Sequence, residues 1–295
     1  MSMFQTFRTR KFIVADTNVW YYLSESHDKK LYKLLQETGV LCATPVNFLE
    51  ISSNINNDNF NKRRNIANTI IDKAEIFLPD NEIFVKQSWG FECYDKYDWR
   101  QAYMNIAKAN NFNELNNGYI DNQYLVVRTF NGKLANAWRK YVYAPFCPLM
   151  IKATNYEVPN YAKKIRNRES IPKLNDPDKI ARYDSEDFIN MIILGVWYRL
   201  VDFERKNNKI LEGCPSSERF SNMRTNFLAY AKVFAEYSRH LATARAKPEE
   251  NDAGDLENFI FLRNDNYILA TAERKWINIG KKVCLSRILD IKKYI

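Results

Sequence analysis

Three short apolar runs stand out along the chain, and each is continuous rather than alternating with polar residues. They are Phe12–Ala15, Val40–Ala43 and Tyr267–Ala270, and polar or turn residues follow each of them. Continuous apolar runs of this length are typical of parallel strands that are covered on both faces. We therefore expect three buried parallel strands, with Val283–Leu285 as a candidate fourth strand.

Helical patterns lie between these runs. Leu31, Leu34 and Leu35 precede the second run, and Phe48 and Ile51 follow it with helical spacing. Strands that alternate with helices in this way predict an α/β fold with a parallel sheet.

The middle of the chain, residues 81–247, shows helical periodicity without the alternation expected of strands. Apolar residues recur every three to four positions in Ser185–Lys206 and again in Glu218–Ala244, which predicts two long amphipathic helices. Ser216 or Ser217 can cap the second of these helices, because a serine oxygen accepts a hydrogen bond from a free N–H group of the first turn.

This pattern predicts a split domain. Residues 1–80 and 248–295 would form the α/β core, and an all-helical insertion at 81–247 would interrupt it. The segment Pro248–Gly254 is expected to be the loop that returns to the sheet.

Composition narrows the classes of function. The five cysteines form no C-x-x-C pair, which argues against a disulfide scaffold or a zinc site and for a reducing compartment. With only two histidines against 35 Asp and Glu residues, we expect carboxylates to carry any chemistry. No apolar run is long enough to span a membrane, and the apolar segment near residue 12 is too short for a signal peptide. A cytoplasmic protein is therefore expected.

Acidic residues fall where the predicted strands end. Asp16 follows the first strand, Glu50 lies in the helix after the second, and Glu273 follows the third. Asp252 and Asp255 mark a helix start just before the third strand. Because parallel strands end at one edge of a sheet, these acids are expected to converge there. Such a cluster repels itself unless cations neutralise it, and oxygen ligands suit Mg²⁺ or Mn²⁺.

Each acid alone also has a structural explanation. Asp16 can cap the following helix, Glu50 can be a solvated helical residue, and Asp252 and Asp255 can favour a helix dipole at its start. Only their joint position at the strand ends favours a site.

Four segments together resemble the motifs of the PIN-domain nucleases. They are Val14–Trp20, Thr44–Glu50, Asn251–Leu256 and Ala270–Trp276. The resemblance covers about 125 residues at the two ends of the chain and leaves the helical middle unmatched. It implies a PIN-like α/β/α core around a parallel sheet, and metal-dependent cleavage of phosphodiester bonds, mostly in RNA.

The resemblance also implies roles for single residues. Asp255 and Asp252 compete for the third acidic position, and the interval from Asp255 to the last motif fits the family spacing better. The implied catalytic and metal-binding acids are Asp16, Glu50, Asp255 and Glu273, with Asp252 as the alternative ligand.

The implied chemistry needs no serine or cysteine nucleophile. One or two Mg²⁺ or Mn²⁺ ions would activate a water that displaces the 3′ oxygen and leaves 5′-phosphate and 3′-hydroxyl ends. Asn18 and Thr271 would orient the ligands or the water.

Positive charge is concentrated in one part of the predicted insertion. The chain carries a net charge of +9, and residues 131–182 hold 11 Lys and Arg against 4 Asp and Glu. Residues 84–161 hold 17 of the 42 aromatic residues, although many rings can serve the helical core. Basic side chains beside aromatic rings are typical of single-stranded nucleic-acid binding. The residues expected to contact RNA are Lys163, Lys164, Arg166 and Arg168.

Three functions remain open on these grounds. The first is a metal-dependent endoribonuclease, a toxin or defence effector, which implies an inhibitor or complex partner to restrain it. The second is a catalytically inactive PIN-fold module that binds RNA or protein in a larger complex, which the glutamate at position 273, usually an aspartate in the family, favours. The third is a relative of DNA-acting 5′ nucleases, which would need more acids than the chain offers.

Overall fold

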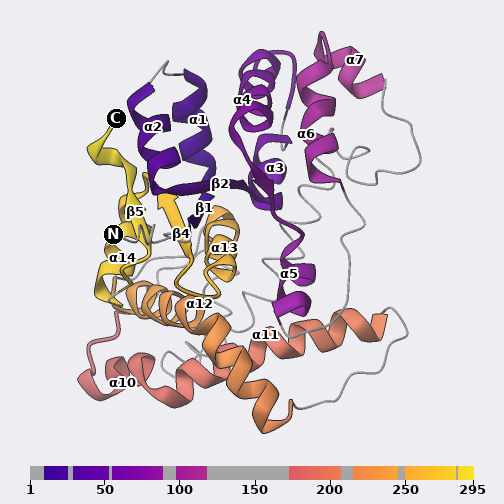
Figure 1. Cartoon of the computed structure of the whole chain (residues 1–295). Helices are drawn as coiled ribbons and strands as arrows, with labels where there is room; N and C mark the ends of the chain where they lie inside the picture. Colours follow the sequence, from indigo (N-terminus) through magenta and orange to yellow (C-terminus); the bar gives the residue numbers. More distant parts are fainter. Residues whose placement is uncertain are drawn as a thin grey trace, which may run out of the picture.

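A five-stranded parallel sheet in the order β3-β2-β1-β4-β5 lies at the centre of the computed structural model (Figure 1). The central strand β1 pairs with β2 on one side and β4 on the other, so that Ile13 lies opposite both Leu41 and Ile268. The strands are β1 (Lys11–Ala15), β2 (Gly39–Ala43), β3 (Ile76–Phe77), β4 (Tyr267–Thr271) and β5 (Ile288–Asp290).

The structure describes residues 10–25, 29–52, 55–88, 98–117, 173–206, 215–244, 250–283 and 285–295. The three predicted strands are confirmed as β1, β2 and β4, and the expected α/β fold with a parallel sheet is observed. The short edge strand β3, which pairs with the end of β2, was not expected from the apolar pattern.

The candidate fourth strand at Val283–Leu285 is wrong. Helix α14 (Arg274–Lys282) continues up to this segment, and the Val283 N–H group donates to the carbonyl of Ile279 as part of the helix end. The strand that pairs with β4 begins only at Ile288, where Leu269 and Ile288 are partners. The apolar residues Val283 and Leu285 pack against the core from the turn instead.

Successive residues of the central strand face opposite layers, as the two-residue period of a strand requires. Ile13 and Ala15 belong to one hydrophobic cluster, and Val14 belongs to the other. The first cluster is covered by α1 (Thr17–Glu25), α2 (Lys29–Thr38), α3 (Pro45–Ser52), α4 (Phe60–Lys73), α6 (Trp99–Lys108) and α7 (Phe112–Asn117).

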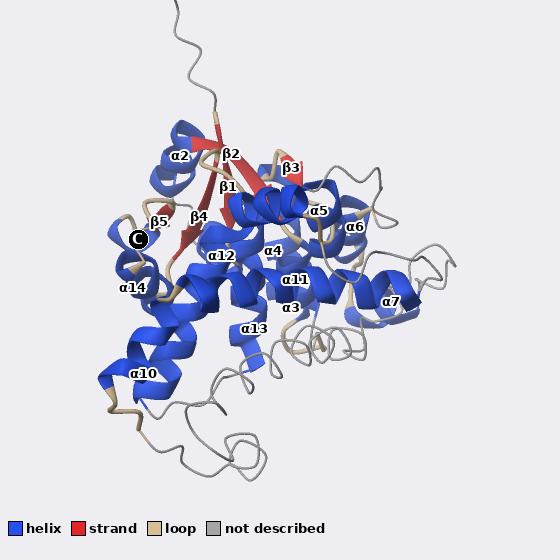
Figure 2. Cartoon of the chain, turned by 90° about the horizontal axis from the view of Figure 1, so that it is seen from below, coloured by secondary structure: helices blue, strands red, loops and turns tan. Residues whose placement is uncertain are grey.

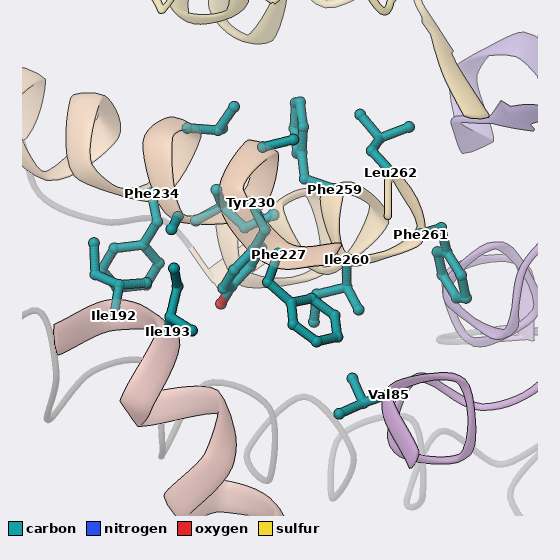
Figure 3. Packing of buried hydrophobic residues seen from close by; sticks show 14 of the residues in the cluster. Val85, Ile192, Ile193, Phe227, Tyr230, Phe234, Phe259, Ile260, Phe261 and Leu262 are labelled. Atoms are coloured by element: carbon teal, nitrogen blue, oxygen red, sulfur yellow. The ribbon is translucent and has the colours of Figure 1, made fainter. Parts of the chain in front are cut away.

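The second face of the sheet packs against helices that come later in the chain (Figure 2). Phe227, Tyr230 and Phe234 of one long helix meet Ile192 and Ile193 of another within this layer (Figure 3). The covering elements are α5 (Asn81–Ser88), α11 (Glu186–Lys206), α12 (Ser217–Ala244), α13 (Glu250–Glu257), the 3-10 helix η3 (Asn258–Phe261) and α14. Short segments at α10 (Pro177–Ala181), η2 (Arg182–Asp184) and η4 (Ile291–Lys293) complete the described elements.

The two long amphipathic helices are confirmed as α11 and α12, and Ser216 caps the second. Its hydroxyl oxygen accepts a hydrogen bond from the N–H group of Arg219 at 3.3 Å. The loop expected at Pro248–Gly254 is wrong in its second half, because α13 begins at Glu250 and Gly254 lies inside it.

The division of the chain at residues 80 and 248 stays a prediction. The described helices between these positions share hydrophobic clusters with the sheet: α5, α11 and α12 belong to one cluster, and α6 belongs to the other. Helix α11 packs on α12, and α12 packs on η3 and α14. In the part of the chain that the structure describes, no helix is both long and apolar enough to cross a membrane.

Candidate active site

Asp16 lies directly after β1 and is held in place by the end of the neighbouring strand. Its backbone N–H group donates to the carbonyl of Ala270 at 3.0 Å, which continues the ladder between β1 and β4. Its carboxylate accepts hydrogen bonds from the backbone N–H group of Thr17 at 2.7 Å and from the hydroxyl of Thr271 at 2.8 Å. The side chain is therefore fixed at the carboxyl edge of the sheet, with the residue only 4% exposed.

Glu273 reaches the same place from the start of α14, where it is the N-cap residue. The amide of Asn18 donates to Oε1 of Glu273 at 3.0 Å and lies 3.5 Å from Oδ2 of Asp16. The Thr271 hydroxyl oxygen in turn accepts from the Glu273 N–H group at 3.1 Å. Asn18 and Thr271 thus connect the first and fourth predicted acids.

A buried asparagine that the sequence reasoning missed joins the first two motifs. The Asn47 side-chain amide donates to the carbonyl of Ala15 and to the Thr17 hydroxyl, both at 3.0 Å. Its carbonyl oxygen accepts from the backbone of Thr44 and from the indole of Trp20. Every hydrogen-bonding group of this side chain is therefore used, and the turn that carries Asp16 is held against the start of α3. The signal that could have revealed Asn47 is an amide side chain that stands between the apolar residues Val46 and Phe48.

Glu50 and Asp255 come from two helices that pack against each other. A Cβ atom on Gly254 of α13 would lie 3.5 Å from Oε1 of Glu50 and 3.7 Å from Val46 of α3. These are ordinary van der Waals distances, so the two helices are in contact at Glu50. Asp255, the next residue, is 8% exposed.

The electrostatics place these acids in one group. Burial, and then the negative charges of Asp16, Glu50 and Glu273, raise the pKa of Asp255 well above its ordinary value. Burial also raises the pKa of Asp16 to about 6, and the charge of Glu273 acts in the same direction while the Thr271 hydroxyl opposes it. Four separate segments of the chain thus bring mutually repelling carboxyl groups to one edge of the sheet.

The chemistry of this donor set fits a divalent cation. Among the described residues, no Lys or Arg forms an ion pair with Asp16, Asp255 or Glu273, so no cation of this part of the chain offsets their repulsion. As the side chains lie, no three His, Cys, Asp or Glu residues of the described segments are close enough together to hold one metal ion. A bound ion would therefore require side-chain adjustment around Asp16 and its neighbours.

Asp252 lies on α13 as well, but its carboxylate has other contacts. One oxygen accepts from the hydroxyl of Tyr237 on α12, and the other forms an ion pair with Lys275 on α14. Lys275 also lies over the ring of Trp276, with 4.7 Å between the ammonium and the ring centroid. Asp252 thus connects three helices, and the geometry favours Asp255 as the third acid.

Exchanging each of these two aspartates for asparagine should have opposite effects. Asp255→Asn is expected to abolish cleavage and, because it removes a buried repelling charge, to leave the metal-free protein at least as stable. Asp252→Asn is expected to lower the free energy of unfolding by roughly 1–3 kcal/mol, since Lys275 and Tyr237 lose a charged partner. Thermal unfolding and an RNA cleavage assay on both variants check this. Loss of cleavage in Asp252→Asn alone would reverse the assignment.

The basic residues predicted to contact RNA, which are Lys163, Lys164, Arg166 and Arg168, lie outside the described residues, as does most of 131–182. Their contact with nucleic acid stays a prediction.

Comparison of the chain with models of protein families, with curated proteins and with solved structures finds no match. The resemblance to the PIN-domain nucleases therefore remains a prediction that rests on the four motifs.

Proposed function

We propose that this protein is a metal-dependent nuclease that hydrolyses RNA phosphodiester bonds, with Asp16, Glu50, Asp255 and Glu273 as the acids that hold Mg²⁺ or Mn²⁺. One observation carries the proposal: Asp16 and Glu273 meet at the carboxyl edge of the sheet, where Asn18 and Thr271 connect them. The raised pKa of the buried Asp255, to which Asp16, Glu50 and Glu273 contribute, supports the same grouping. Perturbed carboxyl groups at the carboxyl edge of a parallel sheet are typical of functional sites.

The residues of the chain have distinct tasks in this proposal. A bound divalent ion supplies a Lewis acid and lowers the pKa of a coordinated water. The Thr271 hydroxyl and the Thr17 N–H group fix the orientation of Asp16. The Asn18 amide restrains Glu273, so that the carboxylate keeps its position relative to Asp16. Asp16, Thr17 and Thr271 are buried, so these groups are held rigidly at the edge.

RNA as substrate, rather than DNA, rests on the family resemblance and on the basic segment 131–182. We include in the proposal a cytoplasmic location, and an inhibitor or complex partner, because an unrestrained ribonuclease would damage the cell that makes it.

A second candidate is a PIN-like module that binds RNA or protein without cutting. The observation that favours it is the placement of the acids, since no three of them among the described residues share one metal position. In addition, one oxygen of Glu273 is already bound by Asn18.

The test is a cleavage assay on a mixture of single-stranded RNA and DNA in Mn²⁺, with EDTA as the blank and Asp16→Asn as the control. Cleavage of RNA alone is expected. Cleavage of DNA would instead favour the 5′ nuclease relatives, and binding without cleavage of either would favour the second candidate.

A further inference from the structure

The outer face of α1 leads away from the acidic edge. Asn18, Tyr21 and Glu25 lie three, and then four, residues apart, so they form one stripe along the helix. Asn18 contacts the acids, whereas Tyr21 is partly exposed and Glu25 is exposed. A ligand that extends beyond the acidic edge along this helix meets Tyr21 first.

Two cations of α4 lie on Tyr21, since α1 and α4 are neighbours (Figure 1). The Arg63 guanidinium donates from Nη1 to the Tyr21 hydroxyl and, at 3.2 Å, to the carbonyl of Glu50. Its central carbon is 5.6 Å from the Tyr21 ring centroid, and the ammonium of Lys62 is 5.1 Å from it. Arg63 is therefore held against the backbone of Glu50, one of the four acids, and Lys62 lies over the same tyrosine ring.

Neither cation is needed where it lies for the stability of α4. Lys62, Arg63 and Arg64 occupy the start of this helix, where the macrodipole disfavours positive charge, and the first turn carries no acid. Arg64 is accounted for by the carbonyls of Ala109 and Asn110. Within the described segments, Lys62 has the exposed Glu25 as its one ionic partner, a pair of little energetic value.

Arg63 retains donors that the described part of the protein does not use. Both of its hydrogen bonds come from Nη1, which leaves the N–H groups of Nε and Nη2 for another acceptor. A guanidinium whose adjacent Nε and Nη2 both have N–H groups available can bind a phosphate through two hydrogen bonds.

We infer that Lys62 and Arg63, held on the Tyr21 ring, bind the backbone phosphates of a single RNA strand next to the bond that lies at the acidic edge. The inference rests on the proposed function. The acids repel the phosphates of a strand that crosses them, so cations within reach of Glu50 are required to hold it. A single strand fits better than a duplex, because Asp16 and Asp255 are each less than one-tenth exposed and only a narrow, flexible chain can approach them.

The test measures binding in EDTA, where metal-dependent cleavage cannot occur. The full-length protein is titrated into a fluorescein-labelled RNA of about 12 nucleotides, a length typical of single-strand sites, at KCl concentrations between about 50 and 200 mM. In the double variant Lys62→Gln/Arg63→Gln, we expect affinity to fall roughly tenfold at the lowest salt. The slope of log K against log salt should flatten by about 1.4, or about 0.7 for each lost phosphate contact.

Two further variants complete the design. Lys33→Gln removes an exposed lysine that is likewise paired with an acid, Glu37, on α2, and it should leave the slope unchanged. Arg63→Lys retains the charge and should restore most of the slope. A double variant with an unchanged slope would overturn the inference, and equal losses for duplex and single strand would overturn its assignment to a single strand. Because binding is read without cleavage, a protein that binds as expected but never cuts would contradict only the proposed function.

Discussion

Replacing Asp16 with asparagine should abolish RNA cleavage while the protein still folds. Asp16 is the acid with the most restraints, since Thr17 and Thr271 both donate to it and Asn18 lies within reach. Asparagine has the same shape but no charge, so a divalent ion loses a ligand that the site was built to orient. We expect a fall in rate of roughly 1,000-fold, which corresponds to a loss of about 4 kcal/mol in transition-state stabilisation.

The measurement is cleavage of single-stranded RNA in Mn²⁺, read together with the thermal unfolding midpoint in EDTA at neutral pH. The midpoint of Asp16→Asn should be equal to that of the wild type or higher, because a buried charge next to Glu273 has been removed. Asp72→Asn is the matched control, since Asp72 is a largely exposed aspartate paired with Lys73 on α4. Full activity of Asp16→Asn in Mn²⁺ would refute the assignment of the metal site.

The metal-free protein should lose stability as the pH rises from about 4 to above 6. The pKa of Asp16 is raised from 3.8 to about 6 in the folded protein. Between these values the unfolded chain has released the proton and the folded protein still holds it, so the free energy of unfolding decreases with pH. For Asp16 alone, the free energy of unfolding decreases by about 3 kcal/mol over this pH range, and the raised pKa of Asp255 acts in the same direction.

A divalent ion should reverse this loss. Mg²⁺ or Mn²⁺ binds the ionised acids of the folded protein, so it should raise the unfolding midpoint at pH 7.5. It should have less effect at pH 4.5, where Asp16 holds its proton. Thermal unfolding followed over this pH range, with EDTA or with Mn²⁺, measures both effects. In Asp16→Asn, the free energy of unfolding should decrease less with pH than in the wild type, because Asp16 no longer contributes to the decrease. A midpoint that responds neither to pH nor to the ion would contradict the coupling of the acids.

The pattern of apolar residues was sufficient to predict the central strands and the long helices. The apolar runs at 12–15, 40–43 and 267–270 are strands because a segment buried on both faces must be apolar throughout. The long helices α11 and α12 were predictable because their apolar stripes repeat with the helical period over many turns. The strand β5 was placed too early, because three apolar residues after a helix can pack as a helix end as well as a strand.

Part of the candidate site could also be predicted from the sequence, and part required the tertiary structure. That Asp16 and Glu273 end at one edge followed from their places after two parallel strands, since such strands end together. The choice between Asp252 and Asp255 could not be made with certainty from the sequence, because two residues three apart on a helix occupy neighbouring positions. The interval to the last motif favoured Asp255, and the packing of Tyr237 and Lys275 around Asp252 supports the same choice.

The sequence by itself thus determined the three central strands, the long helices and the set of candidate acids, because hydrophobic period and order along the chain are local properties. The tertiary structure decided which acids share an edge and which aspartate pairs with Lys275. It also placed the cations of α4 on Tyr21 beside Glu50. These depend on contacts between segments that are far apart in the chain, and no spacing in the sequence encodes the orientation in which two helices meet.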